Sequence, residues 1–118
     1  MTRDEFDSFC RALPATTNVI QWGNASVWKV GGKIFAICSG WGEGEGPKFS
    51  FKCSDMAFRI LPDQPDIIPA PYLARAKWGQ LERPDAMSDE EFRKHLVAAH
   101  EIIAAKLTKA KRAELVLG

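Results

Sequence analysis

Lysine and tryptophan residues in this sequence have types and spacing that could contact a nucleic acid. Lys48 and Lys52 alternate with apolar residues along one predicted strand, and Lys29 lies on another. Lysine ammonium groups neutralise phosphates, and an indole such as that of Trp22 or Trp78 can stack on a base. The pattern therefore indicates a basic, aromatic sheet surface. The alternative interpretation is that alternating lysines form the solvated side of an antiparallel sheet.

A second candidate site consists of Tyr72, Arg75 and Trp78, which follow a proline-rich connector at residues 62–71. An aromatic pair with one guanidinium is a common anchor set for a protein or small-molecule ligand. A groove between the sheet and the connector would present these three side chains. The alternative is that Tyr72 and Trp78 close the core beneath the connector, which would leave no concavity.

No pattern for catalysis or metal binding stands out. The glycine-rich segment 40–46 lacks the spacing of a phosphate loop, and its Glu43 and Glu45 would repel a phosphate. His95 and His100 are five residues apart, about 140° around a helix, so they cannot hold one metal as an i, i+4 pair would. The sequence therefore predicts no catalytic residue, no metal ligand and no cofactor. It leaves an enzymatic role open and favours a non-enzymatic one.

Composition sets further bounds on function. The 118 residues include 16 Lys and Arg against 15 Asp and Glu, a net charge of +1. A nearly neutral chain excludes a polybasic arm or a membrane-surface peptide, so any DNA site must be a local patch. The length predicts one domain over residues 1–118. Cys10, Cys38 and Cys53 form no C-x-x-C pair and are expected to be buried. With no secretory signal and no membrane-spanning run, the expected location is the cytoplasm.

The elements that must position these residues are helices at both ends and strands between them. Thr2 and Glu5 form a capping box, and an apolar stripe then predicts a helix over residues 3–13. Ser54 is a candidate N-cap of a short helix, and a second capping box at Ser88 starts a long C-terminal helix. Period-2 and apolar runs predict strands at residues 19–22, 26–30, 33–38, 48–53 and 77–81.

Strand alternation predicts which side chains face the core. Gly31 and Gly32 suit a two-residue hairpin, which places Val30 opposite Lys33. The set facing the core is then Trp28, Val30, Lys33, Phe35 and Ile37, and the opposite set is Val27, Lys29, Ile34 and Ala36. In the next strand the inward residues are Phe49, Phe51 and Cys53, and the outward residues are Lys48, Ser50 and Lys52.

The order of these motifs resembles the MmcQ/YjbR-like family over nearly the whole chain. The markers are Trp22-Gly23, the hairpin W-K-V-G-G-K-I-F-A at residues 28–36, Phe51-Lys52, and the Y-L-x-R-x-x-W pattern at residues 72–78. The resemblance implies a frataxin-like (CyaY-like) α+β fold, in which an antiparallel sheet is covered on one face by helices. One departure is His100, where the family often has an aromatic residue.

The resemblance also implies DNA binding by a double-wing arrangement of hairpins, in which segment 40–46 could act as a wing. Iron chemistry does not carry over, because Asp4, Glu5 and Asp7 are too sparse for an acidic ridge and fold alone does not confer function. Two hypotheses result. One is weak, largely sequence-independent DNA binding through Lys29, Lys48 and Lys52. The other is a non-enzymatic interaction module that binds a protein or small molecule at the Tyr72, Arg75 and Trp78 groove.

Overall fold

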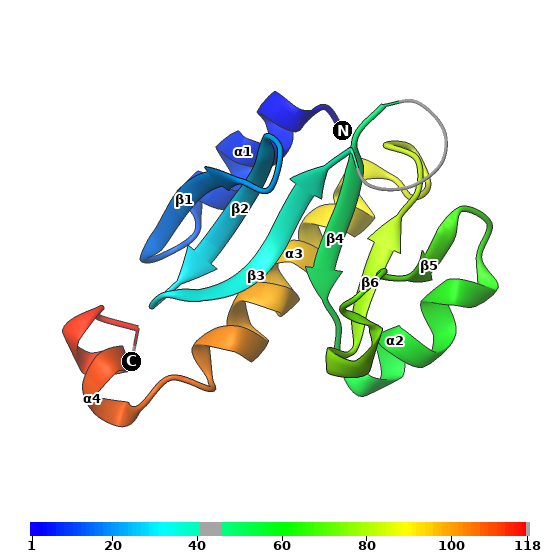
Figure 1. Cartoon of the computed structure of the whole chain (residues 1–118). Coiled ribbons are helices and arrows are strands. Elements are labelled where there is room, and N and C mark those ends of the chain that lie inside the picture. Colours follow the sequence, from blue (N-terminus) through cyan, green and yellow to red (C-terminus); the bar gives the residue numbers. More distant parts are fainter. Residues whose placement is uncertain (41–45, 118) are drawn as a thin grey trace.

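A six-stranded antiparallel sheet organises the protein, in the strand order β1-β2-β3-β4-β6-β5 (Figure 1). The computed structural model describes residues 1–40 and 46–117. The strands are β1 Thr16–Gln21, β2 Ala25–Val30, β3 Lys33–Ser39, β4 Lys48–Lys52, β5 Ile67–Pro69 and β6 Trp78–Leu81. The helices are α1 Arg3–Ala12, α2 Asp55–Ile60, α3 Asp89–Ala104 and α4 Lys109–Glu114, with 3-10 turns η1 Leu61–Asp63 and η2 Ala74–Ala76. The predicted α+β class is confirmed.

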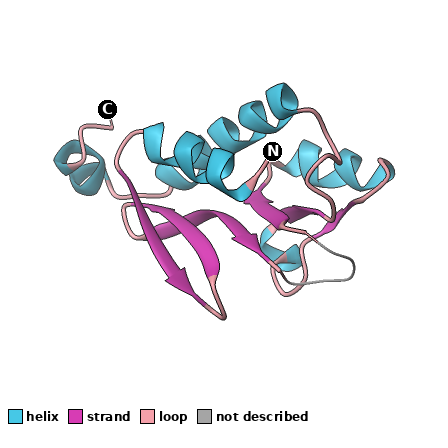
Figure 2. Ribbon diagram, turned by 90° about the horizontal axis from the view of Figure 1, so that it is seen from above, coloured by secondary structure: helices cyan, strands magenta, loops and turns pink. Residues whose placement is uncertain are grey.

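The helix starts follow the capping signals in the sequence. At the start of α1 the Thr2 hydroxyl accepts a hydrogen bond from the Glu5 amide at 3.1 Å, and the Glu5 carboxylate accepts one from the Thr2 amide at 2.9 Å. At the start of α3 the Ser88 hydroxyl accepts from the Glu91 amide at 3.1 Å. These bonds satisfy amides that have no partner within the helix. Both helices lie on one face of the sheet (Figure 2).

Aromatic rings fill the space between this face and the helices. The Phe49 ring of β4 lies 5.1 Å from the Phe6 ring of α1 and 5.2 Å from the Phe92 ring of α3, measured between centroids. Phe51 contacts the same Phe92 ring at 5.5 Å. Trp28 is buried beside them. The predicted inward position of Phe49 and Phe51 is therefore confirmed.

A β-bulge in the β2–β3 hairpin changes part of the predicted alternation. Val30 lies opposite Lys33, as predicted, but Trp28 lies opposite Ala36. The next pair is Lys29 with Ile34, so β3 has one residue between the two pairs where β2 has none. That extra residue is Phe35. A bulge of this kind lets two consecutive side chains point to one side of the sheet.

The bulge reverses the faces of the sheet on which the next two residues lie. Ala36 joins Phe35 in the helix-covered core, whereas Ile37 lies on the opposite face with Val27. The predicted faces are thus wrong for Ala36 and Ile37, because alternation assumes an unbroken register. Lys33, which the alternation assigned to the core set, is exposed at the start of β3.

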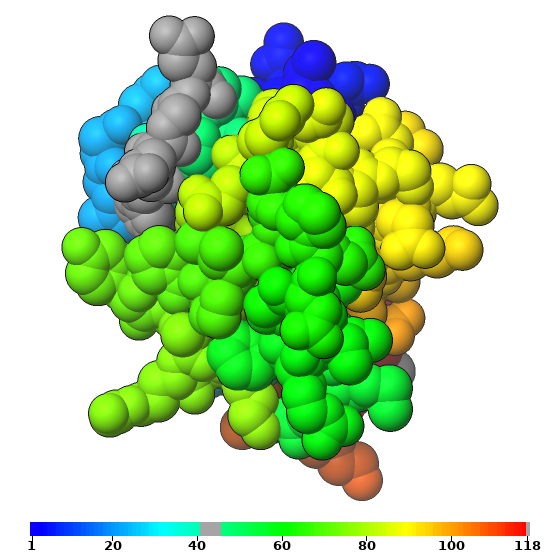
Figure 3. All heavy atoms as spheres, turned by 90° about the vertical axis from the view of Figure 1, so that its right-hand side faces the viewer, coloured from blue at the N-terminus to red at the C-terminus, as the bar shows by residue number. Residues whose placement is uncertain are grey.

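The face of the sheet opposite α1 and α3 is also partly covered, by residues 70–78. In Figure 3 this light-green segment projects to the left, away from the yellow residues of α3 on the right. Trp78 and Ala70 from this segment form a second buried cluster with Ala25, Val27 and Ile37. The proline-rich connector at residues 62–71 is partly regular, because it contains most of η1 and the edge strand β5.

Candidate functional site

The three lysines of the predicted DNA surface do not form an exposed patch. Lys48 is 0% exposed and Lys52 is 7% exposed, and Lys29 is half-buried. The predicted alternation holds, because Lys48 and Lys52 alternate with the inward Phe49 and Phe51, but the predicted solvation of the two lysines is wrong. The physical reason is that β4 lies inside the sheet, between β3 and β6, with chain covering both of its faces.

The Lys52 ammonium group is bound to backbone carbonyls. Its Nζ donates to the oxygens of Ala76 at 2.8 Å, Cys53 at 2.9 Å and Lys77 at 3.5 Å. It thus lies against the carbonyl oxygens at the carboxyl end of η2, and hydrogen bonds to a charged donor are stronger than neutral ones. Burial lowers the pKa of this group below its ordinary value. The Lys48 Nζ donates to the Gly46 oxygen at 3.3 Å. Of the predicted wing, residues 41–45 lie outside the described part of the chain.

Two residues of the predicted aromatic groove, Tyr72 and Trp78, line a pocket. An apolar pocket of about 260 Å³ lies on the face opposite α1 and α3, between the β1–β2 turn and segment 70–73. Trp78, 5% exposed, and Ile37, 1% exposed, line its buried part. The remaining lining residues are Trp22, Ile34, Pro71, Tyr72 and Leu73. The pocket is thus formed by turns and strands that are distant in the sequence.

Tyr72 lies at the mouth of this pocket and is 99% exposed. It occupies the third position of a turn closed by a 3.1 Å hydrogen bond from the Leu73 amide to the Ala70 oxygen. Its φ is +66°, in the left-handed region, where glycine is favoured and a bulky residue is an outlier. The alternative in which Tyr72 and Trp78 both close the core is therefore wrong for Tyr72, whereas Trp78 is buried in the second cluster.

Trp22 forms the opposite side of the mouth and is 52% exposed. It begins the turn between β1 and β2, and its φ is +51°. The next two residues, Gly23 and Asn24, also have positive φ values, +73° and +82°. Left-handed backbone at a residue with a Cβ costs about 1–2 kcal/mol. Both exposed aromatic residues of the pocket therefore hold an unfavourable backbone conformation.

Of the predicted groove residues, Tyr72 and Trp78 are brought together and Arg75 is not among the lining residues. Arg75 lies on η2, exposed, between the two aromatic residues in the sequence. The predicted groove did not include the other lining residues, which are Trp22, Ile34, Ile37, Pro71 and Leu73. The Trp22-Gly23-Asn24 turn was a usable signal for an exposed indole, whereas Ile37 depends on the bulge.

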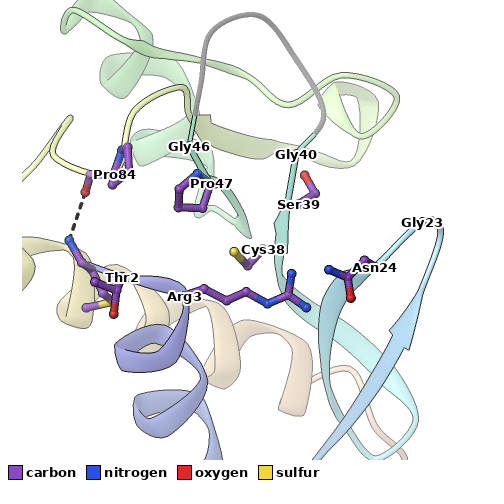
Figure 4. Close-up of a pocket in the computed structure, with 11 residues that line it drawn as sticks. Thr2, Arg3, Gly23, Asn24, Cys38, Ser39, Gly40, Gly46, Pro47 and Pro84 are labelled. Atoms are coloured by element: carbon purple, nitrogen blue, oxygen red, sulfur yellow. Dashed lines mark hydrogen bonds between the residues drawn. The ribbon is translucent and has the colours of Figure 1, made fainter.

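A second cavity, of about 520 Å³, lies at the amino end of α1 (Figure 4). Arg3 extends into it from the helix, toward Asn24 on the β1–β2 turn. The terminal amine of Met1 is engaged with the Pro84 oxygen at 3.3 Å and the Asp89 carboxylate at 2.9 Å. The cavity borders Gly40 and Gly46, the residues next to the undescribed segment. Its described lining offers a helix terminus and one arginine, and no other group there indicates a ligand.

The cysteines are free and buried, as predicted. Burial raises the pKa of the Cys53 thiol to about 11 and that of Cys38 to about 12, and raises the pKa of Cys10 further. Such thiols remain protonated near neutral pH and are poor nucleophiles. Within residues 1–40 and 46–117, no three His, Cys, Asp or Glu side chains gather as a metal site. In the same residues, no helix is long and apolar enough to cross a membrane.

Together the sheet, the helix layer and the pocket define a small α+β protein with one helix-covered face and one partly open apolar face. A family model named YjbR matches residues 11–102, and the chain belongs to the YjbR family. The family resemblance drawn from the sequence is thus confirmed.

Two crystal structures share this fold. One is a Deinococcus radiodurans protein with the family domain DUF419, with a TM-score of 0.85 and 23% identity over 98% of this chain and 88% of that one. The other is a Pseudomonas syringae protein, with a TM-score of 0.71 and 15% identity over 87% of this chain and 99% of that one. Among curated proteins, none matched the sequence.

Proposed function

We propose that this protein is a non-enzymatic binding module, and that the pocket lined by Trp22, Tyr72 and Trp78 holds an apolar ring of its ligand. The observation that supports it most is the state of the two aromatic residues at the mouth. Trp22 and Tyr72 are both exposed, and both have left-handed backbone. Retained strain of this kind clusters at ligand-binding sites, where it positions a side chain in advance.

The pocket has the size and chemistry for a ring. A closed apolar cavity of about 150 Å³ is enough to bind benzene, and this one measures about 260 Å³. Ile37 and Leu73 supply aliphatic walls, and the indoles and phenol supply aromatic ones. A ring placed between Trp22 and Tyr72 would gain aromatic contacts in addition to the burial of its own surface.

The test uses 2-naphthylacetamide, a neutral aromatic probe, in a titration followed by amide chemical shifts. We expect the shifts to change around Trp22, Ile37, Tyr72 and Trp78. Tyr72→Gly should remove the binding while leaving the free energy of unfolding within about 1 kcal/mol of wild type, because glycine relieves the positive φ but adds chain entropy.

The matched control is Met56→Ala, which truncates an exposed apolar side chain of α2. It should leave both the affinity and the chemical-shift pattern unchanged. A wild-type protein whose pocket residues show no shift change with the probe would overturn the proposal. So would a Tyr72→Gly variant that binds as wild type does.

DNA binding through Lys29, Lys48 and Lys52 is the less supported proposal, because two of these ammonium groups are bound to carbonyls. Contacts to phosphates would make affinity for random duplex DNA fall steeply as salt rises. A titration at low and at higher salt tests this, with Lys29→Ala as the variant because Lys29 is the most exposed of the three. Affinity that is absent at low salt, or unchanged by salt, contradicts it.

A further inference from the structure

We propose that the ligand of this pocket is a small aromatic monoanion, whose ring enters the pocket and whose anionic group is held at the mouth by Arg75 and Lys29. This inference rests on the proposed function and adds the charge of the ligand to it. Two observations support it: the position of unpaired cations beside the pocket, and the lack of acidic side chains in its lining.

Lys29 lies beside the pocket wall. It is directly opposite Ile34 in the β2–β3 register, and Ile34 lines the pocket. Residues opposite each other in an antiparallel pair have Cβ atoms about 5 Å apart on the same face. The Lys29 side chain makes no hydrogen bond or ion pair with any other described residue. Its ammonium is therefore available to an anion.

Arg75 is close in the sequence to two residues that line the pocket. It is on η2, three residues after Tyr72 and three before Trp78, both of which line the pocket. It is exposed and, among the described residues, has no ion pair. The nearby Lys77 differs, because its Nζ is paired with the Asp55 carboxylate at 2.9 Å. Arg75 can thus offer a planar, bidentate donor to a carboxylate.

The described lining of the pocket adds no competing negative charge. None of the seven lining residues is acidic. The Asp55 carboxylate is paired with the Lys77 ammonium group, and the Asp66 carboxylate lies 4.0 Å from the Arg83 guanidinium. The mouth therefore carries positive charge although the whole chain has a net charge of only +1. An apolar cavity with a few polar groups at its edge is the usual form of a small-molecule site, and complementary charge selects among ligands.

The experiment compares two probes of nearly equal shape, 2-naphthylacetate and 2-naphthylacetamide. We expect the wild-type protein to bind the carboxylate about fivefold more tightly at low salt, with the preference shrinking as salt screens the charges. The double variant K29Q/R75Q should bind both probes equally. The control R93Q/K109Q removes the same charge from α3 and α4 and should keep the preference.

The outcomes separate this inference from the proposed function. Equal affinity of the wild-type protein for both probes overturns the anion inference and leaves the binding module standing. Binding of neither probe overturns both. A preference for the carboxylate that survives in K29Q/R75Q also overturns the roles of these two cations. Thermal melting of each variant confirms that it is folded before affinities are compared.

Discussion

The same residue type has opposite roles at different positions of this chain. Lys48 and Lys52 are buried in the sheet, with ammonium groups on backbone carbonyls, whereas Lys29 has no partner among the described residues. Strand order alone does not decide this difference, because β2 is an interior strand as β4 is; Lys52 differs in that residues 76 and 77 lie against its ammonium group. A buried ammonium must be hydrogen-bonded, because an uncompensated charge in the interior is costly. Such a lysine is part of the structure and is not available to a phosphate.

His95 shows how burial links a single residue to pH. It lies on α3, with its ring centroid 5.7 Å from that of Phe51, and burial lowers its pKa below the ordinary value of 6.5. As the pH falls below 6.5, His95 therefore becomes protonated more readily in the unfolded chain than in the folded chain. Stability falls as pH drops from 6.5 toward the folded pKa.

The prediction is that His95→Gln weakens this pH dependence. Urea unfolding at pH 7.5 and pH 5.5 should show a smaller loss of free energy in the variant than in wild type. His100→Gln is a useful comparison, because the Nε2 of His100 is 2.7 Å from the Pro14 oxygen and its replacement alters a hydrogen bond at both pH values. Identical pH dependence in wild type and His95→Gln would contradict the prediction.

At the scale of elements, the β2–β3 turn is packed against the chain that follows α3. Gly31 has a φ of +58°, and a Cβ added there would lie 2.6 Å from Cδ1 of the buried Leu107. Gly32 has a φ of +83° and nothing within 4 Å of its added Cβ. Both glycines therefore have left-handed backbone, but only Gly31 is packed closely against another side chain.

Gly31→Ala should destabilise the protein more than Gly32→Ala. Left-handed backbone alone accounts for about 1–2 kcal/mol in each variant. The overlap with Leu107 should add about 1 kcal/mol or more at Gly31, since crowding a packed site forces side chains off their preferred rotamers. Denaturant unfolding measures both values. Equal losses would mean that Leu107 moves aside without cost.

The long C-terminal helix predicted from the sequence is two helices in the structure, α3 and α4. Apolar positions at helical spacing extend to Leu107, but α3 ends at Ala104 and α4 begins after Thr108. The Thr108 hydroxyl accepts a hydrogen bond from the Lys111 amide at 3.1 Å, which is the N-cap of a new helix. Leu107 is buried between the two helices instead of on one continuous stripe.

For the whole molecule, stability depends on the aromatic cluster between the sheet and the helices. Phe49→Ala should lower the free energy of unfolding by about 3–5 kcal/mol, because it leaves a cavity among the rings of Phe6 and Phe92. Urea unfolding tests this value, with Met56→Ala expected to stay within about 0.5 kcal/mol of wild type. A small loss at Phe49 would show that the cluster collapses to fill the space.

Much of this fold could be predicted from local patterns. The capping box at Thr2, the Ser88 cap and the alternation around Phe49 depend on residues a few positions apart, and each was found in the structure. The candidate site was predicted in part. Tyr72 and Trp78 were identified from their residue types, but Trp22 comes from the β1–β2 turn and Ile37 from β3, and no short-range pattern joins them to that segment.

What the sequence alone determined is therefore the α+β class, the helix caps, the hairpin register at Val30 and Lys33, and the family. Only the tertiary structure decided that Lys48 and Lys52 are buried, that Ile37 faces the pocket, and that Tyr72 is exposed. The physical reason is the range of the interactions. Capping and alternation act over three or four residues, whereas strand order, a bulge and the cover of residues 70–78 depend on contacts across the whole chain.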